Sequence, residues 1–260
     1  MNQRATLSEA EIASYASDAV SVLDGARRPD IVLLCEHGGC RVPDKWRGLG
    51  LHEAFFETHY AHDIGSRDLT TAVANRLGAT AVLANYSRLF LDYNRKANDP
   101  SCVRPDMGGI PVPANLHISD EERFQRERIA RSPVERVLEN LLEGERPVGK
   151  LIVSIHSFSP VWEADYRSCQ IGVMWKYDGR LALPLIQAMN VQRRFAVEEN
   201  QPYSFADSDW FTLDRHGLSI AVPNAYIEVR NDLIQNASAV SDMAEVIAVG
   251  IEKAATSLSR

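Results

Sequence analysis

Three apolar segments of this chain each lead to a polar side chain that can bind a metal or move a proton. The segments and their polar residues are 31–35 with His37, 151–155 with His156, and 219–229 with Glu228. Short, nearly continuous apolar runs are typical of buried strands, and segments with helical spacing separate them here. Strands that alternate with helices indicate an α/β fold, so this pattern constrains the whole chain.

The order of the segments predicts a three-layer α/β/α sandwich, hydrolase-like, around a mixed and largely parallel sheet. We expect helices at 7–22, 119–142, 181–189 and 241–258, and further strands at 79–84, 169–175 and 195–197. Residues 87–95 are interpreted as extended chain, and 96–117, rich in Pro, Gly and Asn, as a long functional loop. No linker or repeat divides the sequence, so residues 1–260 are predicted to form a single catalytic domain.

The three polar residues are expected to converge, because the carboxyl ends of strands in an α/β sheet lie along one edge. Two neutral imidazoles and a carboxylate suit zinc, which in catalytic sites commonly keeps three protein ligands and an open position for water. Taken alone, His37 can equally be a ligand, a base or a packed histidine. Four other histidines are interpreted as structural: His52, His59, His117 and His216.

Arginines near these segments indicate an anionic substrate. Arg88 and Arg95 flank an Asp-Tyr-Asn motif, and a guanidinium binds a carboxylate through two hydrogen bonds. The alternative is that they form ion pairs with acidic residues of the chain. Glu228 lies within an apolar segment, where an unpaired carboxylate is costly, so it needs either a partner such as Arg230 or a function.

Composition excludes several classes of partner. The net charge of −7 leaves no basic footprint for nucleic acid or an anionic membrane, and no segment is long and apolar enough for a membrane span. Four scattered cysteines and the lack of a signal-peptide pattern favour a cytoplasmic protein with reduced thiols. No nucleophile elbow, phosphate-binding loop, dinucleotide fingerprint or HExxH motif is present.

A series of ordered motifs resembles the N-formylglutamate amidohydrolases (N-formylglutamate deformylases), in particular their shorter bacterial members. The motifs span residues 31–234 and read CEHGGCRVP, HDIGSRDL, YSRLFLDYNR, IPVPAN, IVSIHSFSPVW, NQPYS and IEVRNDLI. This resemblance implies a fold related to the zinc carboxypeptidases and aspartoacylases. It also implies one zinc ion and a hydrolase that acts in histidine degradation.

By the same resemblance, His37 and His156 match the two histidine ligands of zinc. Asn94 and Arg95 match an Asn-Arg pair that binds a substrate carboxylate, and Glu228 matches the general base. Arg88 and Arg230 are reserve carboxylate-binding residues, and Tyr203 is expected to close over the substrate.

The third metal ligand is less clear, because the carboxypeptidase pattern has a glutamate where this chain has Cys40. Asp63 is the favoured substitute, with Cys40 as an alternative. Glu36 is expected to point away from His37, since side chains alternate along a strand, and so to support the site or pack beside it. Gly38 and Gly39 are interpreted as a turn that clears space for the substrate.

The implied function is zinc-dependent hydrolysis of N-formylglutamate, or a similar small anionic N-acyl amino acid, to formate or another acid and the free amino acid. One alternative is a carboxypeptidase-like or aspartoacylase-like hydrolase of another N-acyl acid. Another is a non-catalytic module that binds a small anion on the same fold. The sequence leaves the acyl group, the metal loaded in the cell and the oligomeric state open.

Overall fold

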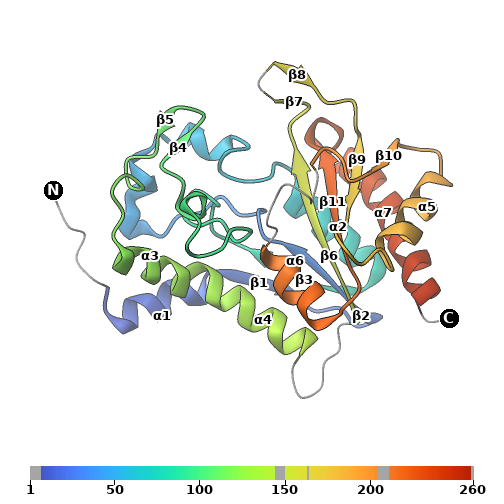
Figure 1. Ribbon diagram of the computed structural model, residues 1–260, viewed down its shortest axis with the longest axis horizontal. Coiled ribbons are helices and arrows are strands. Elements are labelled where there is room, and N and C mark those ends of the chain that lie inside the picture. Colours follow the sequence, from blue (N-terminus) through green and yellow to red (C-terminus); the bar gives the residue numbers. More distant parts are fainter. Residues whose placement is uncertain (1–6, 144–149, 163, 204–210, 259–260) are drawn as a thin grey trace.

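A mixed seven-stranded sheet forms the centre of the computed structural model, which describes residues 7–143, 150–162, 164–203 and 211–258 (Figure 1). Its strands, in spatial order, are β1 (Val20–Leu23), β3 (Ala79–Ala84), β2 (Arg28–Cys35), β6 (Leu151–Phe158), β11 (Asn224–Arg230), β9 (Ile171–Met174) and β10 (Val197–Glu199). The pairs β3–β2, β2–β6, β6–β11 and β9–β10 are parallel, whereas β1–β3 and β11–β9 are antiparallel. The predicted mixed, largely parallel sheet is confirmed.

Helices cover both faces of the sheet. One layer contains α2 (Ser66–Leu77), α5 (Ala182–Asn190) and α7 (Ala237–Leu258), and the other contains α1 (Glu9–Ser17), α3 (Asp120–Arg126), α4 (Ser132–Leu142) and α6 (Phe211–His216) (Figure 1). Alternate residues of β2 enter two separate cores, Ile31 and Leu33 on the side of α2 and α7, Val32 and Leu34 on the side of α4. This alternation produces the three layers predicted from the sequence.

Shorter elements join these layers. Two small hairpins, β4 (Asp106–Met107) with β5 (Ile110–Pro111) and β7 (Val161–Trp162) with β8 (Asp165–Tyr166), project from the loops. One π-helical segment (Glu127–Arg131) connects α3 to α4. The 3-10 segments are Asp44–Gly50, Glu53–Glu57, Pro100–Val103, Leu218–Ile220 and Asn231–Leu233.

Some sequence-based boundaries are wrong, for identifiable reasons. The predicted helix at 7–22 ends at Ser17, because the β-branched Val20 and Val22 pair with the edge of β3. Residues 87–95 are not extended: the amides of Phe90 and Leu91 both bond back to the carbonyl of Ser87, which makes a turn. The last predicted strand, 219–229, begins only at residue 224, after a 3-10 turn.

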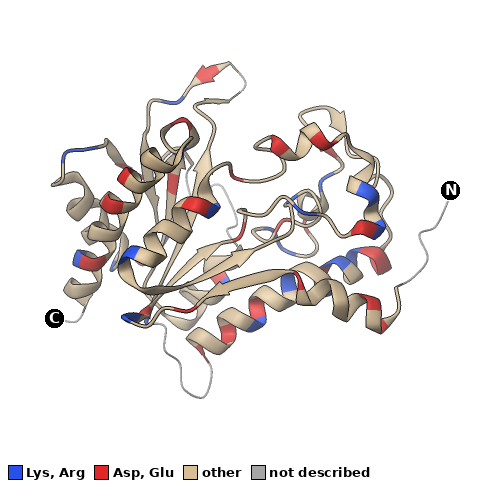
Figure 2. Ribbon diagram, turned by 180° about the vertical axis from the view of Figure 1, so that it is seen from behind, with Lys and Arg blue, Asp and Glu red and all other residues tan. Residues whose placement is uncertain are grey.

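Charged residues of both signs are mixed along the helices of the chain (Figure 2). This distribution agrees with a modest net charge of −7 and with surfaces that face water. Among the described residues, no helix has the length and apolar character required to cross a membrane.

Candidate metal centre and active-site pocket

The sheet brings three of the predicted site residues to one edge. His156 in β6 and Glu228 in β11 are direct partners in the parallel register, and His37 follows the end of β2, the other neighbour of β6. Asp63 lies in the loop before α2, and its amide donates to the carbonyl of His37 at 2.8 Å. Strand register and this loop contact therefore fix the positions of all four residues.

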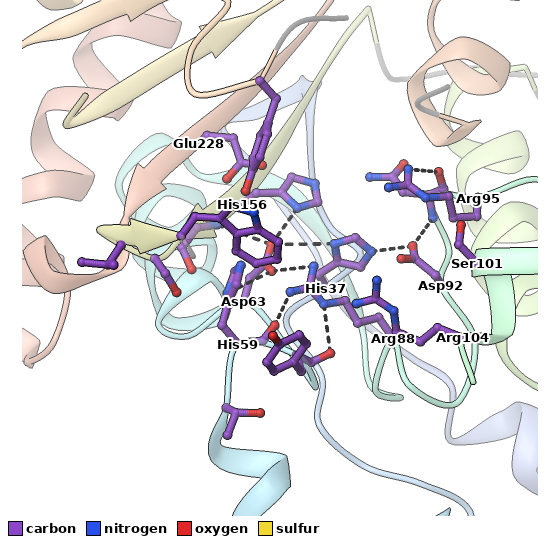
Figure 3. A pocket seen from close by; sticks show the side chains of 18 residues that line it. His37, His59, Asp63, Arg88, Asp92, Arg95, Ser101, Arg104, His156 and Glu228 are labelled. Atoms are coloured by element: carbon purple, nitrogen blue, oxygen red, sulfur yellow. Dashed lines mark hydrogen bonds and ion pairs between the residues drawn. The ribbon is translucent and has the colours of Figure 1, made fainter. Parts of the chain in front are cut away.

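His37, Asp63 and His156 form a buried cluster in which one ligand atom from each lies within 4.8 Å of the others (Figure 3). Asp63 Oδ2 is 2.8 Å from His156 Nδ1 and 3.7 Å from His37 Nδ1. The three residues are at most 6% exposed. Two imidazole nitrogens and one carboxylate oxygen, turned toward a common point, are a donor set that zinc accepts.

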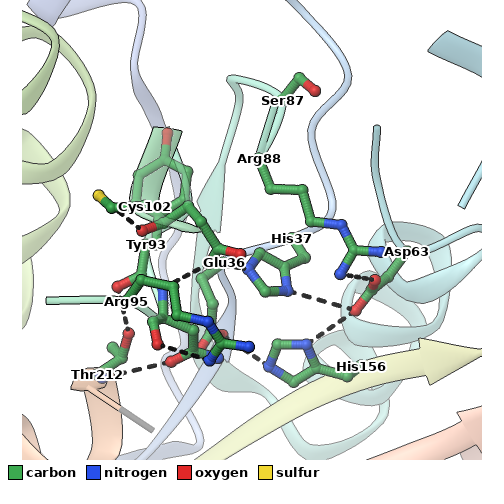
Figure 4. A network of polar contacts seen from close by, with 12 residues as sticks. Glu36, His37, Asp63, Ser87, Arg88, Tyr93, Arg95, Cys102, His156 and Thr212 are labelled. Carbon is green, nitrogen blue, oxygen red and sulfur yellow. Dashed lines mark hydrogen bonds and ion pairs between the residues drawn. The ribbon is translucent and has the colours of Figure 1, made fainter. Parts of the chain in front are cut away.

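The outer nitrogens of both imidazoles have their own polar partners (Figure 4). His37 Nε2 lies 2.8 Å from Asp92 Oδ1, and His156 Nε2 lies 2.8 Å from Ser154 Oγ and 3.2 Å from Glu36 Oε2. Acceptors at Nε2 hold the proton there and leave the Nδ1 lone pair free to face a metal. The residues thus fit a metal both in type and in orientation.

Interactions between charged side chains stabilise the cluster of His37, Asp63 and His156 without a bound ion. Burial lowers the pKa of His156, but the carboxylates of Glu36 and Asp63 outweigh this effect and raise its pKa well above the ordinary value. Burial raises the pKa of Asp63, but Arg88 and the two imidazoles keep that pKa low. Positive and negative groups therefore compensate one another within this buried cluster.

Arg88, predicted as a reserve for substrate binding, lines the pocket but is engaged by the protein. Its Nη1 lies 3.3 Å from Asp63 Oδ1, its Nε donates to the carbonyl of Tyr60, and its Nη2 donates to the carbonyl of His59. This geometry makes Arg88 the charge partner of Asp63.

The cluster opens into a pocket of about 580 Å³ that also contains Glu228 (Figure 3). Glu228 is 6% exposed, and its Oε2 has no hydrogen-bond partner among the described residues. Burial, opposed by His156 and reinforced by Asp63, raises the pKa of Glu228 to about 7. A carboxylate with such a pKa, next to a possible metal site, is suited to accept and return a proton near neutral pH.

Asn94 presents a fixed hydrogen-bond donor to the same pocket. Its Oδ1 accepts from the Thr212 amide at 3.3 Å and lies 2.7 Å from the Tyr226 hydroxyl. Because the oxygen faces these groups, the amide NH₂ remains for an acceptor in the pocket. Arg95, which also lines the pocket, donates from Nη1 to the carbonyl of Asn94 at 3.2 Å.

The remaining predicted residues occupy different places. Tyr203 lines the pocket, and its hydroxyl accepts from Arg167 Nη1 at 3.0 Å. Arg230 is outside the pocket lining: its Nε pairs with Asp232 at 2.8 Å, and its Nη1 donates to two backbone carbonyls. Glu36 lies on the outer side of His156, and Cys40 does not belong to the cluster formed by the described ligand atoms.

Gly38 and Gly39 do not line the pocket, and both lie close to neighbouring parts of the chain. A Cβ on Gly39 would lie 2.3 Å from the backbone carbon and oxygen of Asn85, and one on Gly38 would lie 2.6 Å from Cys35 Sγ. The two glycines therefore allow the loop that carries His37 to pack closely against its neighbours.

Several pocket residues were not identified from the sequence. Asp92, His59, Ser101, Arg104 and Trp162 all line the pocket. His59 was interpreted as structural, yet burial lowers the pKa of this imidazole to about 3, and the neutral ring forms part of the pocket wall. Asp92 had one available signal, its position two residues before the Asn-Arg pair, but its contact with His37 depends on the fold of the turn at 87–95.

Comparisons with known proteins bear on the family and the fold of the chain. The family model for N-formylglutamate amidohydrolase matches residues 30–235. A solved structure of a gene product from Agrobacterium tumefaciens is 30% identical, covers 98% of this chain and 100% of its own, and superposes with a TM-score of 0.86. The N-formylglutamate amidohydrolase of Ralstonia eutropha JMP134 is 17% identical, covers 93% of this chain and 98% of its own, and has a TM-score of 0.66, which shows a shared fold. The curated protein sequences gave no significant match.

Proposed function

Because the chain belongs to the N-formylglutamate amidohydrolase family, we propose that it is a zinc-dependent hydrolase of N-formylglutamate or a similar N-acyl amino acid. The products are formate, or another acid, and the free amino acid. The observation that carries this proposal is the opening of the His37, Asp63 and His156 cluster into the pocket that holds Glu228. A single catalytic domain with a role in histidine degradation belongs to the same proposal.

His37 Nδ1, His156 Nδ1 and a carboxylate oxygen of Asp63 would hold the zinc ion. When bound, zinc supplies Lewis acidity, which makes water a nucleophile near neutral pH and polarises a carbonyl. Asp92 and Glu36 keep the two imidazoles in the orientation that this requires. Arg88 forms an ion pair with the other oxygen of Asp63 and so balances the charge of that carboxylate.

Glu228 is the proposed proton carrier of the reaction. Its Oε2 lacks a hydrogen-bond partner within the described chain and lies in the pocket, so it can take a proton from the attacking water and return it to the departing amine nitrogen. Asn94 and Arg95 provide donors for the α-carboxylate of the substrate, and Tyr203 lies at the pocket wall where it can cover the bound molecule. These contacts hold the amide bond in position for attack.

Metal analysis combined with formate release from N-formyl-L-glutamate tests the proposal. We expect about one zinc per chain and turnover that a chelator abolishes. Glu228→Gln should lower kcat by at least about 100-fold while the dissociation constant for the substrate changes little, because Gln retains the shape but cannot accept the proton.

Two results would count against this function. Absence of turnover by zinc-loaded protein on a panel of N-formyl and N-acetyl amino acids would refute hydrolysis of these amides. Substrate binding without turnover would instead favour the anion-binding module. A preference for N-acetyl over N-formyl compounds would leave the proposed amide hydrolysis in place and change only the acyl group assigned to the substrate.

A further inference from the structure

Arg88, Arg95 and Arg104 all line the pocket, and Arg104 is the one whose role the proposed function leaves unexplained. Arg88 is engaged by Asp63 and by backbone carbonyls, and Arg95 lies beside Asn94, where the α-carboxylate is proposed to bind. Within the described ranges, the guanidinium of Arg104 forms neither a hydrogen bond nor an ion pair. A half-buried, unpaired cation beside two others is unfavourable unless a ligand compensates it.

The charges around Arg104 also leave its positive charge incompletely compensated. Burial lowers its pKa, and the like charge of Arg88 lowers it further, while the nearby carboxylates of Asp92 and Asp106 oppose the change only in part. An anion bound at Arg104 would offset both the cost of burying the guanidinium and the repulsion from Arg88. A guanidinium also offers a planar pair of donors that matches a carboxylate.

The backbone at Arg104 is held in place by a hydrogen-bond network, so its side chain starts from a fixed point beside the pocket. The carbonyl of Arg104 accepts from Asn115 Nδ2 at 2.8 Å, and Asn115 Oδ1 accepts from the fully buried Arg126 at 2.8 Å. The carbonyl of the next residue, Pro105, accepts from the amide of Val112 at 2.8 Å. A backbone ordered before the ligand arrives loses less entropy on binding.

Arg104 and the proposed reaction centre lie at different parts of the pocket. In Figure 3, Arg104 is drawn beside Arg88 and below Arg95 and Ser101, all to the right of His156, whereas Glu228 is drawn at the upper left. A substrate with its amide near Glu228 and its α-carboxylate at Asn94 and Arg95 therefore leaves Arg104 for a second anionic group, that of the side chain.

We propose that Arg104 is the specificity-determining residue that binds the side-chain carboxylate of the substrate and so selects N-acyl derivatives of acidic amino acids. This inference rests on the proposed function, because it takes the position of the amide and of the α-carboxylate from it. It adds the residue that distinguishes a dianionic substrate from a monoanionic one.

The test compares N-formyl-L-glutamate with N-formyl-L-glutamine, which has the same shape but a neutral side chain. Arg104→Met should lower kcat/KM for the glutamate compound by about 10- to 100-fold and change the glutamine compound by less than about twofold, because only the glutamate compound loses a hydrogen-bonded charge pair. Arg104→Lys should restore part of the preference, since it keeps the charge without the planar pair of donors. Arg136→Met, at an exposed position on α4, is the matched control and should leave both values unchanged.

Equal losses on both compounds would overturn the inference, because they would show a general effect on the site. Calorimetric binding of the two compounds to zinc-loaded Glu228→Gln protein, with and without Arg104→Met, separates this inference from the proposed function. If the protein hydrolyses neither compound, the proposed function fails, and the binding data decide on Arg104. Tighter binding of the glutamate compound that Arg104→Met abolishes supports the inference, and equal binding of the two compounds refutes it.

Discussion

Replacing the buried His216 should make the protein more resistant to mild acid. His216 ends α6, is 1% exposed, and has no hydrogen-bond partner at Nδ1 or Nε2 within the described part of the chain. Burial, with the nearby charge of Arg215, lowers its pKa from 6.5 to about 4. The imidazole therefore stays neutral in the folded protein while it takes up a proton in the unfolded chain below about pH 6.5.

The sign and size of the effect follow from this difference. A folded-state pKa below the unfolded value means that stability falls as the pH drops through 6.5 and stops falling below about 4. With 1.36 kcal/mol per pKa unit, the loss at pH 5 amounts to about 2 kcal/mol relative to pH 7.5. His216→Leu removes this proton uptake without removing a hydrogen bond that the described residues form.

Urea unfolding of metal-free protein at pH 7.5 and pH 5 measures the effect. The free energy of unfolding of His216→Leu, relative to the wild type, should rise by about 2 kcal/mol on going from pH 7.5 to pH 5. Leu213→Ala, in the same helix, is the control: it should destabilise by a similar amount at both pH values. A difference between His216→Leu and wild type that is the same at both pH values would refute the reasoning.

Two further predictions concern the metal centre and the loop that carries Arg104. Asp92→Asn should weaken zinc binding by about 10- to 100-fold in competition with a chelating dye, because the amide no longer fixes the orientation of the imidazole; the exposed Asp106→Asn should leave the affinity unchanged. Arg126→Leu should lower the free energy of unfolding by about 3 to 5 kcal/mol in urea titrations, since it removes three buried hydrogen bonds and a partly buried one to Glu122. Arg128→Leu, which removes a surface ion pair, should change that free energy by less than about 1 kcal/mol.

The sheet and its strand-end residues were predictable because their signal is local. The apolar run before His156 and the one around Glu228 each specify a buried strand, and the strand at 79–84 has the bounds that the sequence indicates. The edge strand β1 was missed, because Val20–Leu23 follows a helical pattern and forms a strand only by pairing with β3.

The pocket wall was less predictable, because it depends on loops whose conformation no periodic pattern encodes. Asp92 reaches His37 only because the chain turns back at Ser87. Arg104 lies in a segment rich in Pro, Gly and Asn, whose path is set by a side chain 22 positions further along the sequence, the buried Arg126. Long-range contacts of this kind become visible only when the layers are assembled.

The direct pairing of Glu228 in β11 with His156 in β6 limits which substitutions the protein can accept during evolution. Their separation is set by backbone hydrogen bonds of the innermost strands, so no surface substitution alters it without shifting the whole register. The groups that would contact the variable part of a substrate lie instead on loops around residues 59–60, 101–104 and 159–162. The fold therefore separates the residues of the proposed chemical step from those that would choose the substrate, and mutagenesis libraries aimed at new substrates should vary the loops and leave the two strands intact.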